Sequence, residues 1–128
     1  MKSTCSISLL SFLAFIIFFM STLSQAAPIE ARGSMSGDAT YYDVGLGSCG
    51  ETNSNDDMVV ALSSELMGGS GSSYCGKTIN VKGSSGSVSV TVVDTCPGCG
   101  KEDVDLSPSA FKKLGELGEG RISVTWSI

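Results

Sequence analysis

The sequence contains no histidine in its 128 residues. Catalytic sites that pair a serine or cysteine nucleophile with a histidine base are therefore excluded. Cysteines held in disulfides are not nucleophiles either, because the thiolate is the reactive species. Carboxylates remain as the groups that could carry acid–base chemistry in this chain.

Positive charge is scarce. Eight Lys and Arg stand against thirteen Asp and Glu, which gives a net charge of −5. Binding of polyanions depends on clustered Lys and Arg. We therefore expect neither nucleic acid nor an anionic membrane surface as a partner.

Long hydrophobic runs are absent except near the N-terminus. Leu9–Met20 is an apolar segment that is short for spanning a bilayer, Lys2 precedes it, and the small residues Ser24 and Ala26 follow it. This pattern is typical of a secretory signal peptide, with a retained membrane anchor as the alternative.

These features divide the chain into three parts. We predict a signal peptide over 1–26, a flexible leader over 27–37 and one small domain over 38–128. After cleavage no other segment could cross a membrane. The expected product is a monomer that is secreted to the extracellular space or the cell wall.

Four cysteines remain once Cys5 leaves with the signal peptide, namely Cys49, Cys75, Cys96 and Cys99. An even number in a secreted chain predicts two disulfides. Three pairings are open, of which we favour Cys49 with Cys75 and Cys96 with Cys99. The spacing would also suit a zinc site, but an oxidising destination argues against it. No metal and no cofactor are expected.

The stretch "CPGC", residues 96–99, has the spacing of redox motifs. Here it follows a strand into a turn and does not open a helix in a βαβ unit. A redox function is therefore disfavoured.

Alternating apolar and polar residues indicate strands. The clearest case is "SVSVTVVD", residues 87–94, in which Val88, Val90 and Val92 share one face. Further strands are predicted over 38–44, 58–67, 77–83 and 121–128, the second of them finishing as a helical turn.

One helix start stands out, with Ser107 as N-cap and Pro108 at the first helical position. Gly115 or Gly118 should end this helix. Five or six short strands, one or two short helices and Gly- and Ser-rich turns predict a mostly β fold. A small barrel is favoured over a sandwich, because no long crossover helix separates the strands.

The segment "VVDTCPGCGKEDVDLSPSAF", residues 92–111, carries the most specific signal. Together with "GDATYY", "SCG", "VVALSSELM", "YCGKTINV" and "GRISVTW", it resembles the secreted single-domain double-psi β-barrels. These include the barwin and expansin group and the lytic transglycosylase-like RlpA domains. The chain is most similar to the short fungal loosenin-like proteins. The resemblance implies a six-stranded double-psi β-barrel with a polysaccharide-facing groove.

The same resemblance implies a site. In the family, a strand-end Asp and the Asp of "DLSP" meet beside a Thr of the first strand, and these correspond to Asp94, Asp105 and Thr40. Asp105 would be the proton donor, with Asp94 and Thr40 orienting its proton or a sugar hydroxyl. The structural alternatives are an Asp105 that favours a helix start and an Asp94 that binds turn amides.

Aromatic residues could add sugar contacts. Tyr41 and Tyr42 are neighbours on a strand and face opposite sides, so one is expected in the core and the other against a sugar ring. Tyr74 lies in a loop beside a cysteine and could line the same groove. Trp126 alternates with Ile122 and is expected in the core.

Three functions are compatible with these residues. The first is a protein that binds and loosens cell-wall chitin, cellulose or peptidoglycan without net hydrolysis. The second is a weak glycoside hydrolase or lytic transglycosylase. The third is a protein-binding module, either a cysteine-protease inhibitor or a host-directed effector, that acts through loops 45–57 and 68–75. Cys96 replaces an aromatic residue of bacterial expansins, which argues against tight cellulose binding.

Overall fold

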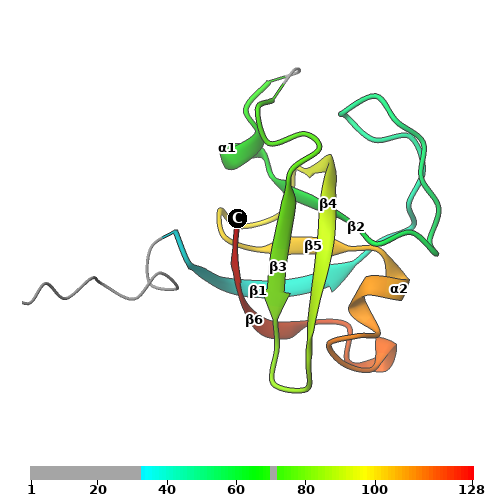
Figure 1. The fold of residues 1–128 in the computed structure, drawn as a ribbon, viewed down its shortest axis with the longest axis vertical. Coiled ribbons are helices and arrows are strands. Elements are labelled where there is room, and N and C mark those ends of the chain that lie inside the picture. Colours follow the sequence, from blue (N-terminus) through cyan, green and yellow to red (C-terminus); the bar gives the residue numbers. More distant parts are fainter. Residues whose placement is uncertain (1–32, 70–71) are drawn as a thin grey trace, which may run out of the picture.

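The computed structural model describes residues 33–69 and 72–128. The predicted signal peptide and residues 27–32 of the predicted leader lie outside the described residues. The strands are β1 (Met35–Tyr41), β2 (Val59–Ser63), β3 (Thr78–Lys82), β4 (Ser87–Cys96), β5 (Val104–Leu106) and β6 (Ile122–Ser127) (Figure 1). The helices are α1 (Ser64–Met67), α2 (Pro108–Phe111) and the 3₁₀ helix η2 (Leu117–Glu119).

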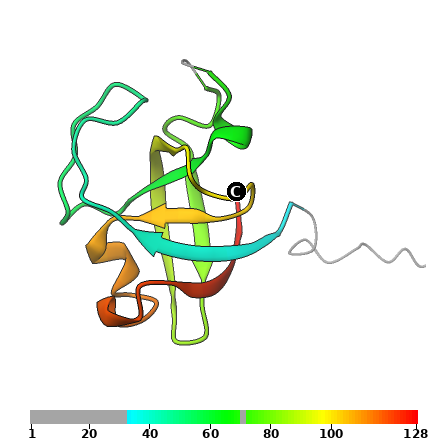
Figure 2. The ribbon, with the colours of Figure 1, turned by 180° about the vertical axis from the view of Figure 1, so that it is seen from behind.

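The six strands close into a barrel in the order β1-β5-β2-β4-β3-β6. The pairs β1·β5 and β2·β4 are parallel, and the other four pairs are antiparallel. Figure 2 shows β5 lying beside β1. Pairing of β1 with β6 completes the closure. Every strand therefore has two neighbours and no sheet edge is left open. The predicted six-stranded double-psi barrel is confirmed.

The barrel interior is filled by the apolar faces that alternation predicted. Val90 and Val92 of β4 are buried, and Val88 packs against the same cluster. Trp126 is 2% exposed, as expected, and its indole Nε1 donates a hydrogen bond to the Glu102 carbonyl over 2.8 Å. This contact satisfies the one polar atom of the ring.

A β-bulge interrupts β4 where it runs beside β2. Val60 pairs with Val92, but Ala61 pairs with Asp94, so Val93 is an extra residue on β4. Without the bulge, Asp94 would follow Val92 onto the inner face, because side chains alternate. The bulge turns Asp94 outward, which is a common use of bulges near functional sites.

Some boundaries differ from the predictions. β1 begins at Met35, inside the predicted leader, because Met35 pairs with Trp126 and Ser36 with Thr125. β5 is an additional short strand that the sequence pattern did not locate.

The main predicted helix is also shorter than expected. The Ser107 hydroxyl accepts from the Ala110 amide as predicted, yet α2 ends at Phe111. A new N-cap at Glu116, with a capping box to Glu119, starts η2 instead. Among the described residues no helix has the length and apolarity needed to cross a membrane.

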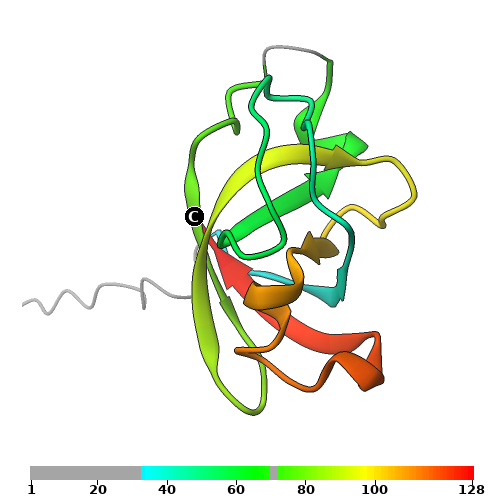
Figure 3. The same cartoon turned by 90° about the vertical axis from the view of Figure 1, so that its right-hand side faces the viewer.

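Two disulfides join the cysteines as favoured above. Cys49–Cys75 links residues 26 apart, and Cys96–Cys99 closes a turn. Figure 3 shows the segments that carry Cys49 and Cys75 at the same end of the barrel.

The two disulfides should differ in their contribution to stability. Replacing Cys49 and Cys75 by Ala should lower the free energy of unfolding by on the order of 3 kcal/mol, because a long loop loses its closure in the unfolded state. The matched change at Cys96 and Cys99 should cost less. Denaturant unfolding of the two variants measures the difference. Two or more thiols titrating in the unreduced, denatured mature protein would contradict the expectation that all four cysteines are in disulfides.

Candidate functional site

Four residues form a row across the outer face of the barrel, one from each of four adjacent strands. Asp94 of β4 and Asp105 of β5 are both in register with Ala61 of β2, and Thr40 of β1 is in register with Asp105. Adjacent strands are about 4.8 Å apart, so roughly 10 Å separates the backbones of the two Asp residues. We call Asp94, Ala61, Asp105 and Thr40 the carboxylate row. Ala61, which is 2% exposed, lies between the two Asp residues in this row.

Asp105 is the member of the row whose environment favours a proton. It lies between the buried Val104 and Leu106, and burial raises the pKa of its carboxyl above the ordinary value. The nearby Asp94 also raises this pKa, whereas the Thr40 hydrogen bond and the Arg121 charge lower it. A carboxyl with a raised pKa keeps its proton to a higher pH than an ordinary carboxyl, which favours a role as proton donor.

Thr40 orients this carboxyl. Its Oγ1 donates a hydrogen bond to Asp105 Oδ1 over 2.7 Å. The contact is the one that the sequence analysis expected between the first strand and the "DLSP" segment. The helix that follows is only four residues long and is capped by Ser107. Asp105 is therefore held by a side-chain hydrogen bond from Thr40, and a favourable effect on the helix start does not account for this contact.

Asp94 has a different environment. Its Oδ1 accepts from the backbone amides of Ser48, over 2.9 Å, and Thr95, over 2.8 Å. The turn-amide alternative is therefore realised in part, although neither amide belongs to the Cys96–Cys99 turn. Gly47 lies so close to the Val93 carbonyl that any side chain there would collide with it. Asp94 thus belongs to the row and also holds the start of loop 45–57 against β4.

Tyr42 brings a hydroxyl group to the two carboxylates. Its OH is buried and has no hydrogen-bond partner among the described residues. Burial, followed by the charges of Asp94 and Asp105, raises the pKa of Tyr42 to about 12. The phenol therefore keeps its proton at any ordinary pH and is available as a donor. A buried donor without a partner is rare in native proteins, so its acceptor is to be sought in a bound water or ligand.

The other two tyrosines lie in different surroundings. Tyr41, which is 36% exposed, packs its ring against Phe111 with centroids 4.9 Å apart. Its hydroxyl donates to the Leu117 carbonyl over 2.9 Å. Tyr74 is partly buried against the core cluster, next to Cys75. Of the four expected binding residues, Thr40 and Tyr42 thus lie with the carboxylates, and Tyr41 supports the helical segment.

Sequence reasoning missed two residues that shape the row. Ala61 separates the carboxylates, and the only signal for it was a small residue within an otherwise bulky run. The charge of Arg121 lowers the pKa of Asp105. The same guanidinium forms an ion pair with Asp38, in which Nη1 and Oδ2 are 3.2 Å apart. The position of Arg121 as the first residue of the predicted strand 121–128 does not indicate this role.

The Cys96–Cys99 turn borders the row. The two Sγ atoms and a carboxylate oxygen of Asp105 all lie within 4.8 Å of one another. The disulfide therefore contributes a sulfur surface beside the Asp105 carboxyl.

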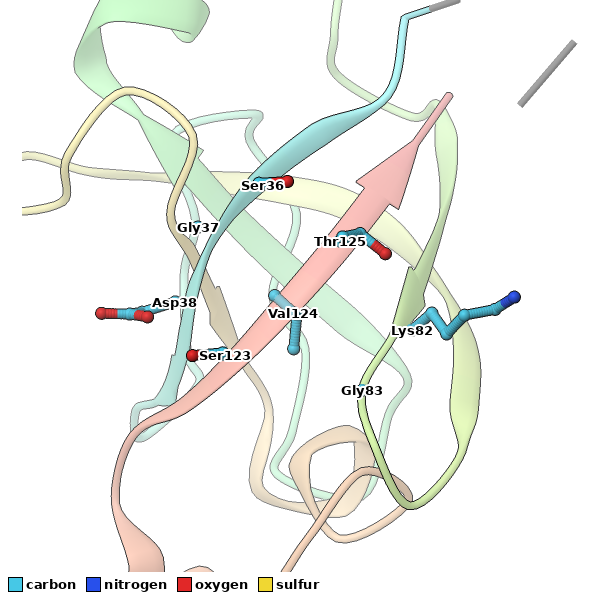
Figure 4. A pocket seen from close by; sticks show the side chains of 8 residues that line it. All are labelled: Ser36, Gly37, Asp38, Lys82, Gly83, Ser123, Val124 and Thr125. Carbon is cyan, nitrogen blue, oxygen red and sulfur yellow. The ribbon is translucent and has the colours of Figure 1, made fainter. Parts of the chain in front are cut away.

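A cavity of ≈ 570 Å³ lies on another part of the barrel, over β1, β3 and β6 (Figure 4). Its lining includes Asp38 and Lys82, whose side chains point to opposite sides in Figure 4. Neither Asp94 nor Asp105 lines it. We assign the candidate site to the carboxylate row, because the perturbed titratable groups Asp105 and Tyr42 gather there.

Comparison with known proteins agrees with this architecture. Residues 34–126 match the family model described as lytic transglycolase. An allergen homolog from Arthroderma benhamiae is 36% identical over 94 residues, which cover 71% of this chain and 33% of the relative. A papain inhibitor from Streptomyces mobaraensis is 32% identical over 108 residues, covering 79% of this chain and 76% of the relative.

Solved structures give the same grouping. An expansin from Clavibacter michiganensis, crystallised with cellohexaose, superposes with a TM-score of 0.67 and 33% identity. The match covers 74% of this chain and 50% of the expansin. The chain thus spans about a third of the allergen homolog and half of the expansin. From the matched family model, the closed barrel and these relatives, the chain belongs to the double-psi β-barrel family described as lytic transglycolase, in its expansin-like group.

Proposed function

We propose that this protein is secreted, binds cell-wall polysaccharide along the carboxylate row and weakens the wall material without net hydrolysis. The observation that carries the proposal is the position of Asp105, a half-buried carboxyl whose pKa is raised, between the Thr40 hydroxyl and the second carboxyl of Asp94. The unpartnered hydroxyl of Tyr42 adds a donor for a sugar oxygen. Sugars present many hydroxyl groups, and a row of carboxylate acceptors and hydroxyl donors matches that chemistry.

Hydrolysis is the less favoured chemistry for this row. A glycoside hydrolase needs one carboxyl as acid and a second that acts on water or on the sugar. Here one Asp94 oxygen already accepts two backbone amides, from Ser48 and Thr95. Burial raises the pKa of the Asp105 carboxyl above its ordinary value. A single proton donor fits non-hydrolytic loosening, with lytic transglycosylation as the enzymatic alternative.

The relatives support a polysaccharide ligand. The Clavibacter expansin was solved with cellohexaose, a β-linked glucan fragment. This chain covers half of that protein. A polysaccharide ligand is therefore proposed from the chemistry of the carboxylate row together with the family, and not from the expansin complex alone.

Export from the cell is part of the proposal. It rests on the predicted signal peptide, 1–26, and on two disulfides, which persist in oxidising compartments.

A binding assay with a product assay tests the proposal. The mature protein is incubated with insoluble cellulose, chitin and peptidoglycan, and bound protein and soluble reducing ends are measured together. We expect binding to at least one polysaccharide with reducing ends at the buffer level. Asp56→Asn serves as a control variant, because it removes one exposed negative charge in loop 45–57 and leaves the carboxylate row unchanged. Reducing ends that grow with time would replace loosening by an enzymatic function, and absence of binding to all three would refute the proposal.

The neighbouring tyrosines allow a sharper test of the row. Tyr42→Phe removes only the buried hydroxyl, so the free energy of unfolding should stay constant or rise by about 1 kcal/mol. Polysaccharide affinity should nevertheless fall several-fold, because the donor is lost. Tyr41→Phe is the matched control, in which stability should fall slightly with the Leu117 hydrogen bond while affinity is unchanged. A Tyr42→Phe variant that loses stability and keeps full affinity would assign the hydroxyl a structural role.

A second function, protease binding, is favoured by one feature of loop 45–57. Leu46 at its start is 73% exposed, which is unusual for a large apolar side chain. The loop is held by the Cys49–Cys75 disulfide and by Asn55, whose side chain accepts from the Val44 amide over 2.8 Å. A rigid loop with an apolar residue suits insertion into a protease cleft, and one relative is a papain inhibitor.

This alternative predicts a papain inhibition that depends on Leu46. Leu46→Ala should raise the inhibition constant at least tenfold, because such central apolar contacts dominate interfaces. Asp105→Asn should leave inhibition unchanged, since it lies in the row. An inhibition constant unaffected by Leu46→Ala, or no inhibition by the parent protein, would exclude papain-like proteases as partners of this loop.

A further inference from the structure

The Cys96–Cys99 turn and Asp105 place three potential metal ligands together. The two Sγ atoms and an Asp105 carboxylate oxygen lie within 4.8 Å of one another, and the Cα atoms of the cysteines are 5.4 Å apart. In the disulfide form the sulfurs are bonded to each other and are not ligands. Cys-X-X-Cys is also the spacing with which thiolates bind zinc.

We propose that reduction of the Cys96–Cys99 disulfide creates a binding site for a thiophilic divalent cation of the zinc type. The ligands would be the two thiolates and the Asp105 carboxylate, with the fourth position left to water. Three protein ligands and one open position form a known class of tetrahedral zinc site. The inference goes beyond the proposed function, and its test does not depend on polysaccharide binding.

Asp105 is prepared for such a role. Thr40 donates to Oδ1, and among the described residues no hydrogen bond engages Oδ2. One carboxylate oxygen is therefore oriented by an outer hydrogen bond while the other is free, which is the common arrangement around metal-bound carboxylates. Asp94, across Ala61, adds negative charge that favours a cation.

The turn is accessible to a reductant. Pro97 and Gly98, between the two cysteines, are exposed. The disulfide closes a loop of only four residues, so it restricts the unfolded chain little and contributes little to the free energy of unfolding. The Cys49–Cys75 disulfide closes a much longer loop and should be reduced later.

The chemistry balances with a thiol or phosphine reductant. A phosphine supplies two electrons, and one water supplies two protons to the sulfurs and its oxygen to the phosphine oxide. With a thiol reductant, two thiols supply both electrons and both protons and leave as their disulfide. The cation then displaces the two thiol protons to solvent and forms two metal–sulfur bonds. Reoxidation would release the cation and return Asp105 to the row.

Cobalt titration tests the inference. The mature protein is treated with limiting phosphine until two thiols are present, and Co²⁺ is added without oxygen. Thiolate-to-cobalt charge-transfer absorption should saturate at one Co²⁺ per chain and disappear when Zn²⁺ is added. The oxidised protein should show no such absorption. Asp105→Asn should weaken Co²⁺ binding at least tenfold. Asp94→Asn, which removes the same charge nearby, should weaken it less.

Three results would overturn the inference. The first is equal Co²⁺ affinity for the parent protein and the Asp105→Asn variant. The second is saturation at one Co²⁺ per two chains, which would indicate four cysteines from two molecules. The third is absence of charge-transfer absorption although Cys96 and Cys99 carry the two titrated thiols.

Discussion

A chain that ends at Gly120 should fail to fold cooperatively. The truncation removes β6, which pairs with both β1 and β3 and closes the barrel. It also removes the buried Val124 and Trp126 from the core. Loss of a buried Trp side chain alone costs about 3–5 kcal/mol, a large part of the 5–15 kcal/mol that stabilises a typical domain. Circular dichroism during heating should show no cooperative transition.

The matched control is a chain that lacks only Ile128. This residue is 54% exposed and lies beyond β6, so its removal should change the midpoint of unfolding by no more than a few degrees. A protein truncated at Gly120 that melts cooperatively, close to the parent midpoint, would show that closure by β6 is not what stabilises the domain.

Replacement of Asp105 by Asn should abolish wall weakening, or any lytic product, and leave the fold intact. The change keeps the size of the side chain and an oxygen that can accept from Thr40. It removes the charge and the transferable proton. Where a positioned carboxyl acts as general acid, its loss typically costs 10²–10⁴-fold in rate, so activity should fall to the buffer level.

The same variant has a signature in the pH dependence of stability. Because burial raises the pKa of Asp105 in the folded state, the folded protein takes up this proton at a higher pH than the unfolded chain. Stability therefore falls as the pH rises from the ordinary value of 3.8 through the raised pKa. Asp105→Asn removes this contribution, so its unfolding midpoint should match or exceed that of the parent at neutral pH. The difference should shrink as the pH is lowered through that window.

Asp94→Asn separates loosening from two-carboxylate hydrolysis. It should impair activity less than Asp105→Asn if one proton donor suffices, and equally if both carboxylates react. Asn keeps an oxygen that can accept from the Ser48 amide, but the hydrogen bond loses its charge assistance, which should also loosen loop 45–57. If both variants fold and both retain full activity on wall material, the carboxylate row is not the site. Protease binding by the loop would then become the leading proposal.

The strands that bury one face could be predicted from the sequence. Alternation located β1, β4 and β6, because each has enough residues for a period of two to be recognised. β2 was located by its β-branched residues, since all five of its residues are buried. β5 has only Val104–Leu106, too few for a period, and it exists because β1 and β2 pair with it on either side. Helix α2 begins at the predicted residue, since its N-cap is local, but its end at Phe111 and the capping box that starts η2 at Glu116 were not predicted.

The site was predicted less completely, because tertiary contacts decide it. The resemblance named Asp94, Asp105 and Thr40, whereas alternation alone would have turned Asp94 into the core. The bulge at Val93 reverses its direction, and no local signal in a run of β-branched residues marks a bulge. Alternation put Tyr41 and Tyr42 on opposite faces, but the expectation that one of them lies in the core was wrong. Tyr41 packs on Phe111, and Tyr42 lies near the two carboxylates.

The most direct test of the carboxylate row is to locate a bound oligosaccharide on the protein in solution. Amide resonances of the ¹⁵N-labelled mature domain are recorded while cellohexaose, and separately chitohexaose, is added. The account predicts saturable shifts for at least one sugar, concentrated at Thr40–Tyr42, at Asp94–Cys96 and at Val104–Leu106. Asp105→Asn should reduce these shifts, and Asp56→Asn should not. Shifts confined to loop 45–57, or equal shifts in the parent and Asp105→Asn proteins, would contradict it.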